Sequence, residues 1–367
     1  MKHIPSELLH EVLLRLPVKS LIRFKGVSKS WHSLISDPDF ATSHCDKACA
    51  PTRKLLLLRS YTFHDVRSID PDASLLHDSP SAPLDVNFLP AARGVNLVGS
   101  CRGLILLEHS KNLYLWNPFT GAHRLMPLSH AASITNSMVF PILCSFVYDP
   151  STLDYSVVLV SYVPSEIHAT TLVEVFSFKA NTWKKIEATH LNYANGVDDV
   201  IRVGSLFNGA IHWVAFCLEK MEYLIVVFDL KEMTFSEISP PNELPWDYRF
   251  CELWVLGGFL SLWVVENNTT AIWVMEEYKV QSSWTKTLVV SFDQVPTKCF
   301  FPVCTAKNGD IVGSVDNTGL LKCDNEGQVK EQRSYWTDHH EFQVQVIEYT
   351  ESLLSLPGPP EQAEEDD

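Results

Sequence analysis

Apolar residues in the first forty positions recur at intervals of three and four, which is typical of short amphipathic helices. One face of a first helix carries Leu8, Leu9, Val12, Leu13 and Leu16. Pro5 and Ser6 suit its first turn, because backbone N–H groups there have no partner within the helix. Pro17 ends it.

A second helical stretch begins near Val18, and Asp37 and Pro38 end it. Its apolar positions continue the helical spacing: Leu21, Phe24, Val27, Trp31, Leu34 and Ile35. A segment of about forty residues has too little core to be stable alone, so its apolar face needs a cover. That cover is either another chain or the rest of this one.

From Leu55 onwards the pattern changes to short apolar or alternating runs, which indicate β-strands. The runs lie at residues 55–58, 103–107, 113–116, 145–148, 157–162, 173–178, 211–216, 224–230, 253–265, 271–275, 311–315 and 342–349. Gly257 and Gly258 break the longest run. Long helical patterns are absent, which predicts an all-β domain.

Several of these runs end in a polar turn, and an aromatic or apolar residue then begins the next strand. The turns lie 47 to 60 residues apart, near Asn117, Ser177, Asp229, Glu276 and Asp324. This spacing fits one four-stranded blade of a β-propeller, and about 300 residues would form six or seven blades. We expect the terminal strands 55–58 and 342–349 to share one blade. Two stacked β-sandwiches are the alternative, because the repeat is irregular.

The net charge of -15 is spread unevenly, because residues 1–54 hold nine Lys or Arg against five Asp or Glu. The β-rich part is therefore strongly acidic. This argues against a nucleic-acid partner, since phosphate contacts need concentrated Lys and Arg. The longest stretch without charged residues, 125–148, is interrupted by proline and polar residues, so we expect no membrane segment.

Nine cysteines, an odd number scattered along a long chain, indicate reduced thiols. The N-terminus lacks the continuous apolar core and cleavage site of a secretory signal. Together these features predict a protein of the cytoplasm, the nucleus or both.

Motifs for catalysis and metal binding are missing from the sequence. Residues 99–103 (GSCRG) lack the Lys-Ser/Thr pair of a phosphate-binding loop, and we interpret them as a tight turn into a strand. His44, Cys45 and Cys49 cluster without completing a four-ligand zinc site. No hydrolase elbow, zinc-protease helix or kinase signature occurs. We expect no catalytic residue, metal or cofactor, although distant loops of a propeller could assemble an active site.

The tryptophans fall into two groups. Those at strand positions are interpreted as core between blades: Trp116, Trp183, Trp213, Trp254 and Trp263. The proline-rich segment 239–250 is a candidate contact loop for a target protein, with Trp246, Tyr248 and Arg249 as anchors.

The order of motifs in the first segment resembles the plant F-box motif. The matching positions are Ile4-Pro5, Glu7-Leu8, Leu14-Arg15-Leu16-Pro17-Val18-Lys19-Ser20-Leu21, Arg23-Phe24-Lys25, Val27, Lys29-Ser30-Trp31, Leu34-Ile35 and Asp37-Pro38. Ile4 stands where leucine is more usual, and Ser28 stands where many members have cysteine. Neither departure removes a large apolar contact.

In that family three small helices dock on the Skp-type adaptor of a Skp, cullin and F-box ubiquitin ligase. The resemblance therefore implies an adaptor-binding surface made by Pro5, Leu8, Val12, Leu13, Leu16, Val18, Leu21, Val27, Trp31 and Leu34. The alternative is that these helices pack within the chain as an N-terminal cap.

Later motifs resemble the F-box-associated domain of plant F-box and kelch-type proteins. They are residues 99–104 (GSCRGL), 115–118 (LWNP), 148–149 (YD), 175–183, 208–213 (NGAIHW) and 349–353 (YTESL). This resemblance implies a propeller-like domain that recruits a substrate.

We therefore expect a small all-α F-box at residues 1–45, a linker at 46–54, an all-β substrate-recruiting domain at 55–356, and an acidic disordered tail at 357–367. The expected function is that of a non-catalytic substrate receptor in a ubiquitin ligase. It would bind the Skp-type adaptor, and through it a cullin, together with an unidentified target protein. A propeller enzyme or glycan-binding module with a structural helical cap is the competing hypothesis.

Overall fold

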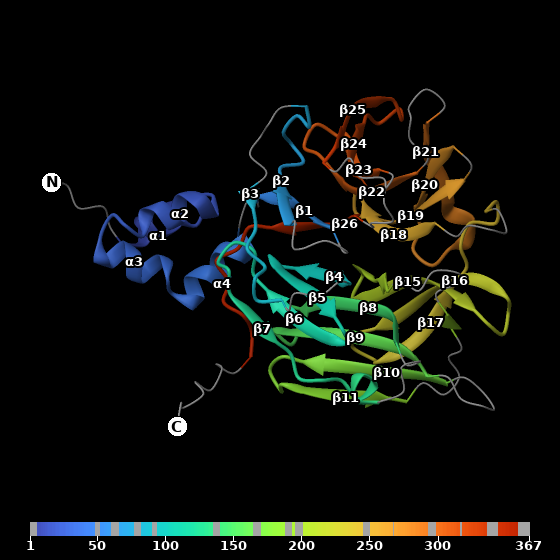
Figure 1. Cartoon of the computed structure of the whole chain (residues 1–367), viewed down its shortest axis with the longest axis horizontal. Helices are drawn as coiled ribbons and strands as arrows, with labels where there is room; N and C mark the ends of the chain where they lie inside the picture. The colour runs from blue at the N-terminus through green and yellow to red at the C-terminus, as the bar shows by residue number, and fades with distance from the viewer. Residues whose placement is uncertain are drawn as a thin grey trace.

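A computed structural model of the chain shows a small helical module beside a larger β-domain (Figure 1). The structure describes residues 6–47, 52–59, 66–76, 82–89, 94–134, 140–163, 170–187, 193–194, 201–244, 250–266, 268–292, 299–315, 318–335 and 344–358. Helices α1 to α3 project from one side of the molecule, and α4 leads from them to the blades (Figure 1).

The helical module contains α1 (Ser6–Leu13), α2 (Val18–Phe24), α3 (Lys29–Ile35) and α4 (Pro38–Lys47). The prediction of one continuous helical stretch from Val18 to Asp37 is wrong, because α2 and α3 are separate helices. A turn after α2 ends in Ser28, whose Oγ accepts a hydrogen bond from the Trp31 N–H and caps α3.

Asp37 and Pro38 begin a helix where the sequence suggested an end. The Asp37 carboxylate accepts the backbone N–H groups of Asp39 and Phe40 at 2.7 and 3.3 Å, and Pro38 takes the first helical position. An Asp-Pro pair fits both a helix stop and a helix start, so the pattern alone did not separate them. Helix α4 consequently runs to Lys47, beyond the expected boundary at residue 45.

The β-domain is a propeller of six sheets, so the lower of the two predicted blade numbers is correct and the sandwich alternative is wrong. In sheet order, the first blade is β26 (Val344–Thr350), β1 (Arg53–Arg59), β2 (Val66–Ile69) and β3 (Ala82–Pro83). The second is β4 (Val95–Cys101), β5 (Leu104–His109), β6 (Asn112–Trp116) and β7 (His123–Leu125). The third is β11 (Thr182–Ile186), β10 (Thr170–Ser177), β9 (Asp154–Val163), β8 (Phe140–Asp149) and β13 (Arg202–Val203).

The fourth blade is β12 (Tyr193–Ala194), β15 (Ala210–Cys217), β16 (Glu222–Asp229) and β17 (Thr234–Ile238), and β14 (Ser205–Phe207) also pairs with β15. The fifth is β18 (Cys251–Leu256), β19 (Phe259–Glu266), β20 (Thr269–Met275) and β21 (Trp284–Ser291). The sixth is β22 (Phe300–Thr305), β23 (Ile311–Val315), β24 (Gly319–Cys323) and β25 (Val329–Ser334). Two short helices, α5 (His130–Ser133) and η1 (Gln281–Ser283), lie between strands.

The first blade joins both ends of the propeller, as predicted. Strands β1 and β26 pair antiparallel, with Leu55 opposite Glu348 and Leu57 opposite Val346. Because β1 and β26 are far apart in the sequence, this pairing closes the ring and covers the edge that each strand would otherwise expose.

The repeated turns join the third and fourth strands of five blades. In three of them an Asx side chain holds the turn, and one of these is Asp324, whose Oδ1 accepts the N–H of Glu326 at 3.0 Å. Asn117 Oδ1 accepts the N–H of Phe119 at 2.9 Å, and Asp229 Oδ1 accepts the N–H of Lys231 at 2.9 Å. The first blade has the same kind of turn after β2, where Asp70 Oδ1 accepts the N–H of Asp72 at 2.9 Å, although its fourth strand is only the two-residue β3.

The core lies between adjacent blades. Trp116, Trp213 and Trp263 are buried, and Trp183 and Trp254 are half-buried. The indole N–H of Trp213 donates to the Cys144 carbonyl at 2.9 Å and links the fourth blade to the third. The prediction that these tryptophans serve as core is confirmed.

Candidate functional site

The helical module touches the propeller through the segment that follows β26 and through the β4–β5 turn. Leu353 of this segment packs against the core of the module. Lys19 Nζ lies 3.4 Å from Glu351 Oε1, and Arg102 Nη2 lies 2.6 Å from Asp46 Oδ1. These contacts hold the module at one edge of the propeller while α1 to α3 project outward (Figure 1).

The module has its own small core. It consists of Leu13, Leu14, Leu21, Ile35 and Phe40, with Leu9, Leu16, Phe24, Trp31 and Leu34 packed around it. These side chains are covered by the helices themselves and not by the strands of the propeller, apart from the contact with Leu353.

Three residues of the expected adaptor surface are therefore interior positions. Leu13, Val18 and Leu21 are buried within this chain, so they cannot contact a partner while the module is folded as it is here. Helical spacing identifies an apolar stripe, but it does not say which part of the stripe faces the module's own helices.

Other apolar residues of the module face solvent. Leu8, Val12 and Val27 are 59%, 57% and 60% exposed, and Leu8 and Val12 lie one turn apart on α1. Ile22 on α2 is 41% exposed and was not among the expected residues. The sequence feature that could have identified Ile22 is its position four residues after Val18, which places both residues on the same side of a helix. We call Leu8, Val12, Ile22 and Val27 the exposed apolar set.

The remaining expected adaptor residues occupy intermediate positions. Leu16, Trp31 and Leu34 are half-buried, and the Trp31 ring packs edge-to-face on Phe24 with centroids 5.5 Å apart. Each presents part of its surface to solvent. Pro5 lies outside the described residues.

The expected substrate anchors Trp246, Tyr248 and Arg249 also lie outside the described residues. Phe250, which follows them, is 45% exposed and packs near Phe301, with ring centroids 6.0 Å apart. The role of the three anchors stays a prediction.

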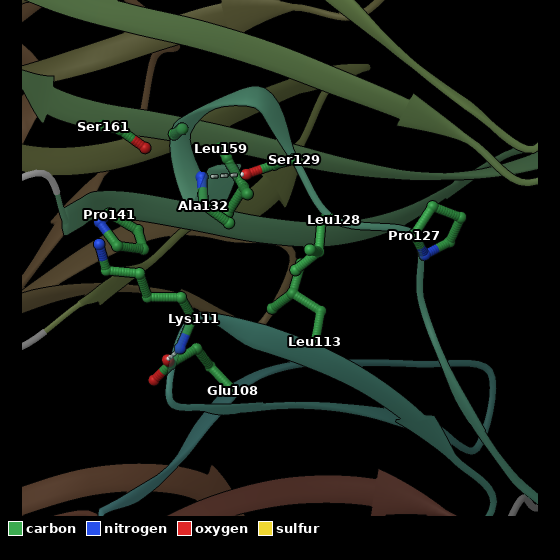
Figure 2. A pocket seen from close by; sticks show the side chains of 11 residues that line it. Glu108, Lys111, Leu113, Pro127, Leu128, Ser129, Ala132, Pro141, Leu159 and Ser161 are labelled. Atoms are coloured by element: carbon green, nitrogen blue, oxygen red, sulfur yellow. Dashed lines mark hydrogen bonds between the residues drawn. The ribbon is translucent and has the colours of Figure 1, made fainter. Parts of the chain in front are cut away.

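A small pocket between the second and third blades is lined by polar groups, of which Glu108 and Ser129 are bonded to their neighbours, while the buried Ser161 hydroxyl has no partner within the described residues. Figure 2 shows Glu108 beside Lys111, where the carboxylate accepts the Lys111 N–H at 2.7 Å. Ser129 accepts the Ala132 N–H at 3.0 Å and caps α5 (Figure 2). These bonds shape local structure and pair no nucleophile with a base.

A buried carboxylate near this pocket also has a structural role. Glu174 accepts hydrogen bonds from the backbone N–H groups of His130 and Ala131 and lies 2.6 Å from His130 Nδ1. It thereby satisfies backbone donors at the start of α5.

Of the residues that clustered in the sequence, His44 and Cys45 have ordinary structural surroundings, and Cys49 lies outside the described residues. His44 is buried, and its Nε2 lies 2.8 Å from the Leu16 carbonyl. Burial raises the pKa of Cys45, and it raises the pKa of Cys101 to about 12, so both thiols stay protonated. The described part of the chain contains no group of three or more His, Cys, Asp or Glu placed to hold a metal ion.

Comparison with known proteins agrees with this architecture. Residues 1–42 match the F-box domain family, and residues 71–323 match the family of the F-box associated beta propeller domain. The chain belongs to the F-box proteins with an associated β-propeller. The resemblances noted in the sequence are thus confirmed for both parts of this F-box protein.

Its relatives include plant F-box proteins. F-box protein CPR1 of Arabidopsis thaliana is 31% identical over 329 residues, covering 79% of this chain and 73% of the relative. An F-box/kelch-repeat protein of the same plant is 29% identical over 309 residues, covering 78% of this chain and 79% of the relative. Among the described residues of the F-box protein, no helix combines the length and apolar character needed to cross a membrane.

Proposed function

We propose that this F-box protein is the substrate-recognition subunit of a Skp-cullin-F-box ubiquitin ligase. The F-box module binds a Skp-type adaptor, and through it a cullin, and the propeller binds a target protein. The observation that carries the proposal is the exposed apolar set, which lies on α1, α2 and the turn after α2, in a module that projects away from the propeller. Apolar side chains gain about 1.5–3 kcal/mol each when a partner covers them fully, which makes this face suited to docking.

The mechanism is proximity. A target held on the propeller meets the ubiquitin-charged enzyme of the same assembly at high effective concentration, so the receptor needs no catalytic group. The contacts of Lys19 with Glu351 and of Arg102 with Asp46 support this role, because they fix the direction in which the propeller presents its target.

A purely structural helical cap is the competing hypothesis, either on an enzyme or on a glycan-binding propeller. A cap would be expected to turn its large apolar side chains towards the blades. Leu8, Val12 and Val27 do the opposite, which favours a docking module.

We place the protein in the cytoplasm, the nucleus or both. The buried cysteines support a reducing compartment, because Cys144, Cys217 and Cys323 sit in apolar cores that have no need of disulfides. A fluorescent fusion of the full chain tests this assignment.

Adaptor binding tests the function directly. Leu8→Asp with Val12→Asp should weaken binding of a purified Skp-type adaptor at least about tenfold, because two charges would replace apolar contacts. Leu153→Asp is the matched control, since Leu153 is a 64% exposed leucine on the propeller, in a β8–β9 turn that tolerates Asp. Unchanged adaptor affinity in the folded double variant would refute the proposed docking face.

A core variant separates docking from folding. Leu13→Ala should destabilise the module by about 2–5 kcal/mol and raise hydrogen exchange in α1 to α3, because it leaves a cavity in a small core. The surface variant should leave that exchange unchanged.

Affinity capture with and without proteasome inhibition then tests whether a bound target is degraded.

A further inference from the structure

A cavity of about 830 Å³ lies where the innermost strands of the blades meet. It is bordered by β4, β8, β13, β18, β22 and β26, several of which are labelled around the middle of the β-domain in Figure 1. Its volume falls within the range of about 300–1,000 Å³ that is typical of small-molecule sites. We call it the channel cavity.

Several polar side chains of the channel cavity are occupied by neighbouring strands. Ser100 Oγ donates to the Glu348 carbonyl at 2.6 Å, and Gln345 Oε1 accepts the Leu97 N–H at 2.6 Å. Ser205 Oγ donates to a carbonyl of β18 at 3.0 Å. These bonds hold adjacent blades together, so the groups that make them have little hydrogen-bonding capacity left for a ligand.

One buried hydroxyl in the lining is different. Ser314 is only 4% exposed, and within the described residues its Oγ has no hydrogen-bond partner. A buried hydroxyl without a partner costs about 1–3 kcal/mol, so a ligand that bonds to it recovers stability.

Two carboxylates share this lining. Glu252 accepts the Val203 N–H, and Arg202 lies near enough to favour its charged form, but burial dominates and raises its pKa. Glu348 Oε1 lies 3.2 Å from Arg53 Nη1, and burial raises the pKa of Glu348 as well.

Each neighbouring arginine also bonds to a backbone carbonyl. Arg53 donates to the Thr305 carbonyl at 2.7 Å, and Arg202 donates to that of Cys251. A carboxylate has about four acceptor positions, so each acid keeps capacity for a further donor.

The rest of the lining includes aromatic residues from three blades. Phe146, Trp254, Trp263 and Phe301 come from the third, fifth and sixth blades, and the last two lie 5.5 Å apart between ring centroids. Such rings contact flat apolar groups and attract cations to their faces.

We propose that the channel cavity binds a small molecule that carries a protonated amine on an aromatic or aliphatic body. The ammonium pairs with Glu252 or Glu348, a second of its three N–H groups meets Ser314, and the aromatic rings of the lining cover the apolar body. An anionic ligand is disfavoured, because the positive groups beside the two carboxylates, Arg53 and Arg202, are already bonded to the protein. The site is separate from the adaptor-binding face.

Fragment binding to the full chain tests the charge requirement. Phenethylamine is compared with 2-phenylethanol and 3-phenylpropionate by isothermal titration and ligand-observed NMR. The amine should bind at least about tenfold more tightly than the alcohol, and the anion should bind most weakly. Equal binding of all three compounds, or no binding of the amine, would overturn the proposal.

Point variants then locate the binding. Glu252→Gln or Glu348→Gln should lower the affinity for phenethylamine about tenfold and leave that for the alcohol unchanged. Glu266→Gln, at an exposed acid of β19, is the matched control and should bind like the wild type.

Ser314→Ala provides a second route if a carboxylate variant does not fold, because removing an unpartnered hydroxyl is not expected to harm folding. It should weaken amine binding several-fold. Full affinity in every folded channel variant would refute the site. Adaptor binding by the same variants shows separately whether the proposed function holds.

Discussion

Gly103 lies in the β4–β5 turn, where there is no room for a side chain. Its φ is +85°, and an added Cβ would lie 2.3 Å from the Ser352 Cβ and 2.6 Å from the Thr350 carbonyl. Thr350 ends β26, and Ser352 lies in the following segment, which contacts the helical module. The GSCRG motif therefore reflects close backbone packing, which agrees with its interpretation as a turn.

Gly103→Ala should lower the free energy of unfolding by about 3 kcal/mol or more, because backbone strain and a steric clash add together. Gly121→Ala is the matched control. Its φ is +77°, but nothing lies within 4 Å of an added Cβ, so only the strain of about 1 kcal/mol applies. Urea denaturation of both variants measures the difference, and equal losses would contradict the clash.

His212 makes the stability of the propeller depend on pH. It is fully buried on β15, its Nε2 lies 2.9 Å from the Tyr278 hydroxyl, and burial lowers its pKa to about 4. The unfolded chain therefore takes up a proton near pH 6.5 while the folded chain does not. Stability is fully present above that pH and is lost as the pH falls towards 4.

Protonation of His212 in the unfolded chain should lower the free energy of unfolding by roughly 2 kcal/mol between pH 7 and pH 5. His212→Gln should remove that part of the pH dependence while lowering stability at pH 7. Chemical denaturation of both proteins at the two pH values provides the comparison. An identical fall from pH 7 to pH 5 in wild type and variant would show that His212 is not responsible.

At the scale of elements, burial decides how much of the fold the sequence reveals. Strands with continuous buried runs, such as β5 and β15, were predicted because both faces of an inner blade strand are covered. The outer strands β7 and β11 are short and largely exposed, so their sequences resemble loops. The number of blades stayed open because β3 has only two residues, so the first blade leaves a weak strand pattern in the sequence.

The sequence predicted less of the candidate functional site than of the fold. Apolar spacing located the helical module, but inward residues such as Leu13 and outward ones such as Leu8 share the same pattern. The lining of the channel cavity could not be predicted, since Glu252, Ser314 and Glu348 come together only when the blades close into a ring.

At the scale of the whole molecule, two parts of very different size are joined by few side chains. Glu351 is the central one, because its side chain is only 4% exposed and Lys19 is its ionic partner. Arg102 stacks over the Tyr148 ring at 4.1 Å from the centroid while it binds Asp46. It therefore couples the end of α4 to the second and third blades.

Arg102→Ala combined with Leu353→Ala should release the module from its fixed orientation without unfolding the propeller. The first change removes the Asp46 ion pair, and the second removes the propeller's apolar contact with the module core. Two spin labels, one on α3 and one on β25, should give a narrow distance distribution in the wild type and a broad one in the variant.

Lys330→Ala is the control for this experiment, because it removes an ion pair with Asp310 that lies within the propeller. It should leave the distribution narrow. If the double variant also keeps a narrow distribution and its thermal unfolding is unchanged, the orientation does not depend on these contacts. If the distribution broadens, ubiquitin transfer to a bound target should slow while adaptor affinity stays the same, since a mobile propeller holds its target near the charged enzyme for less of the time.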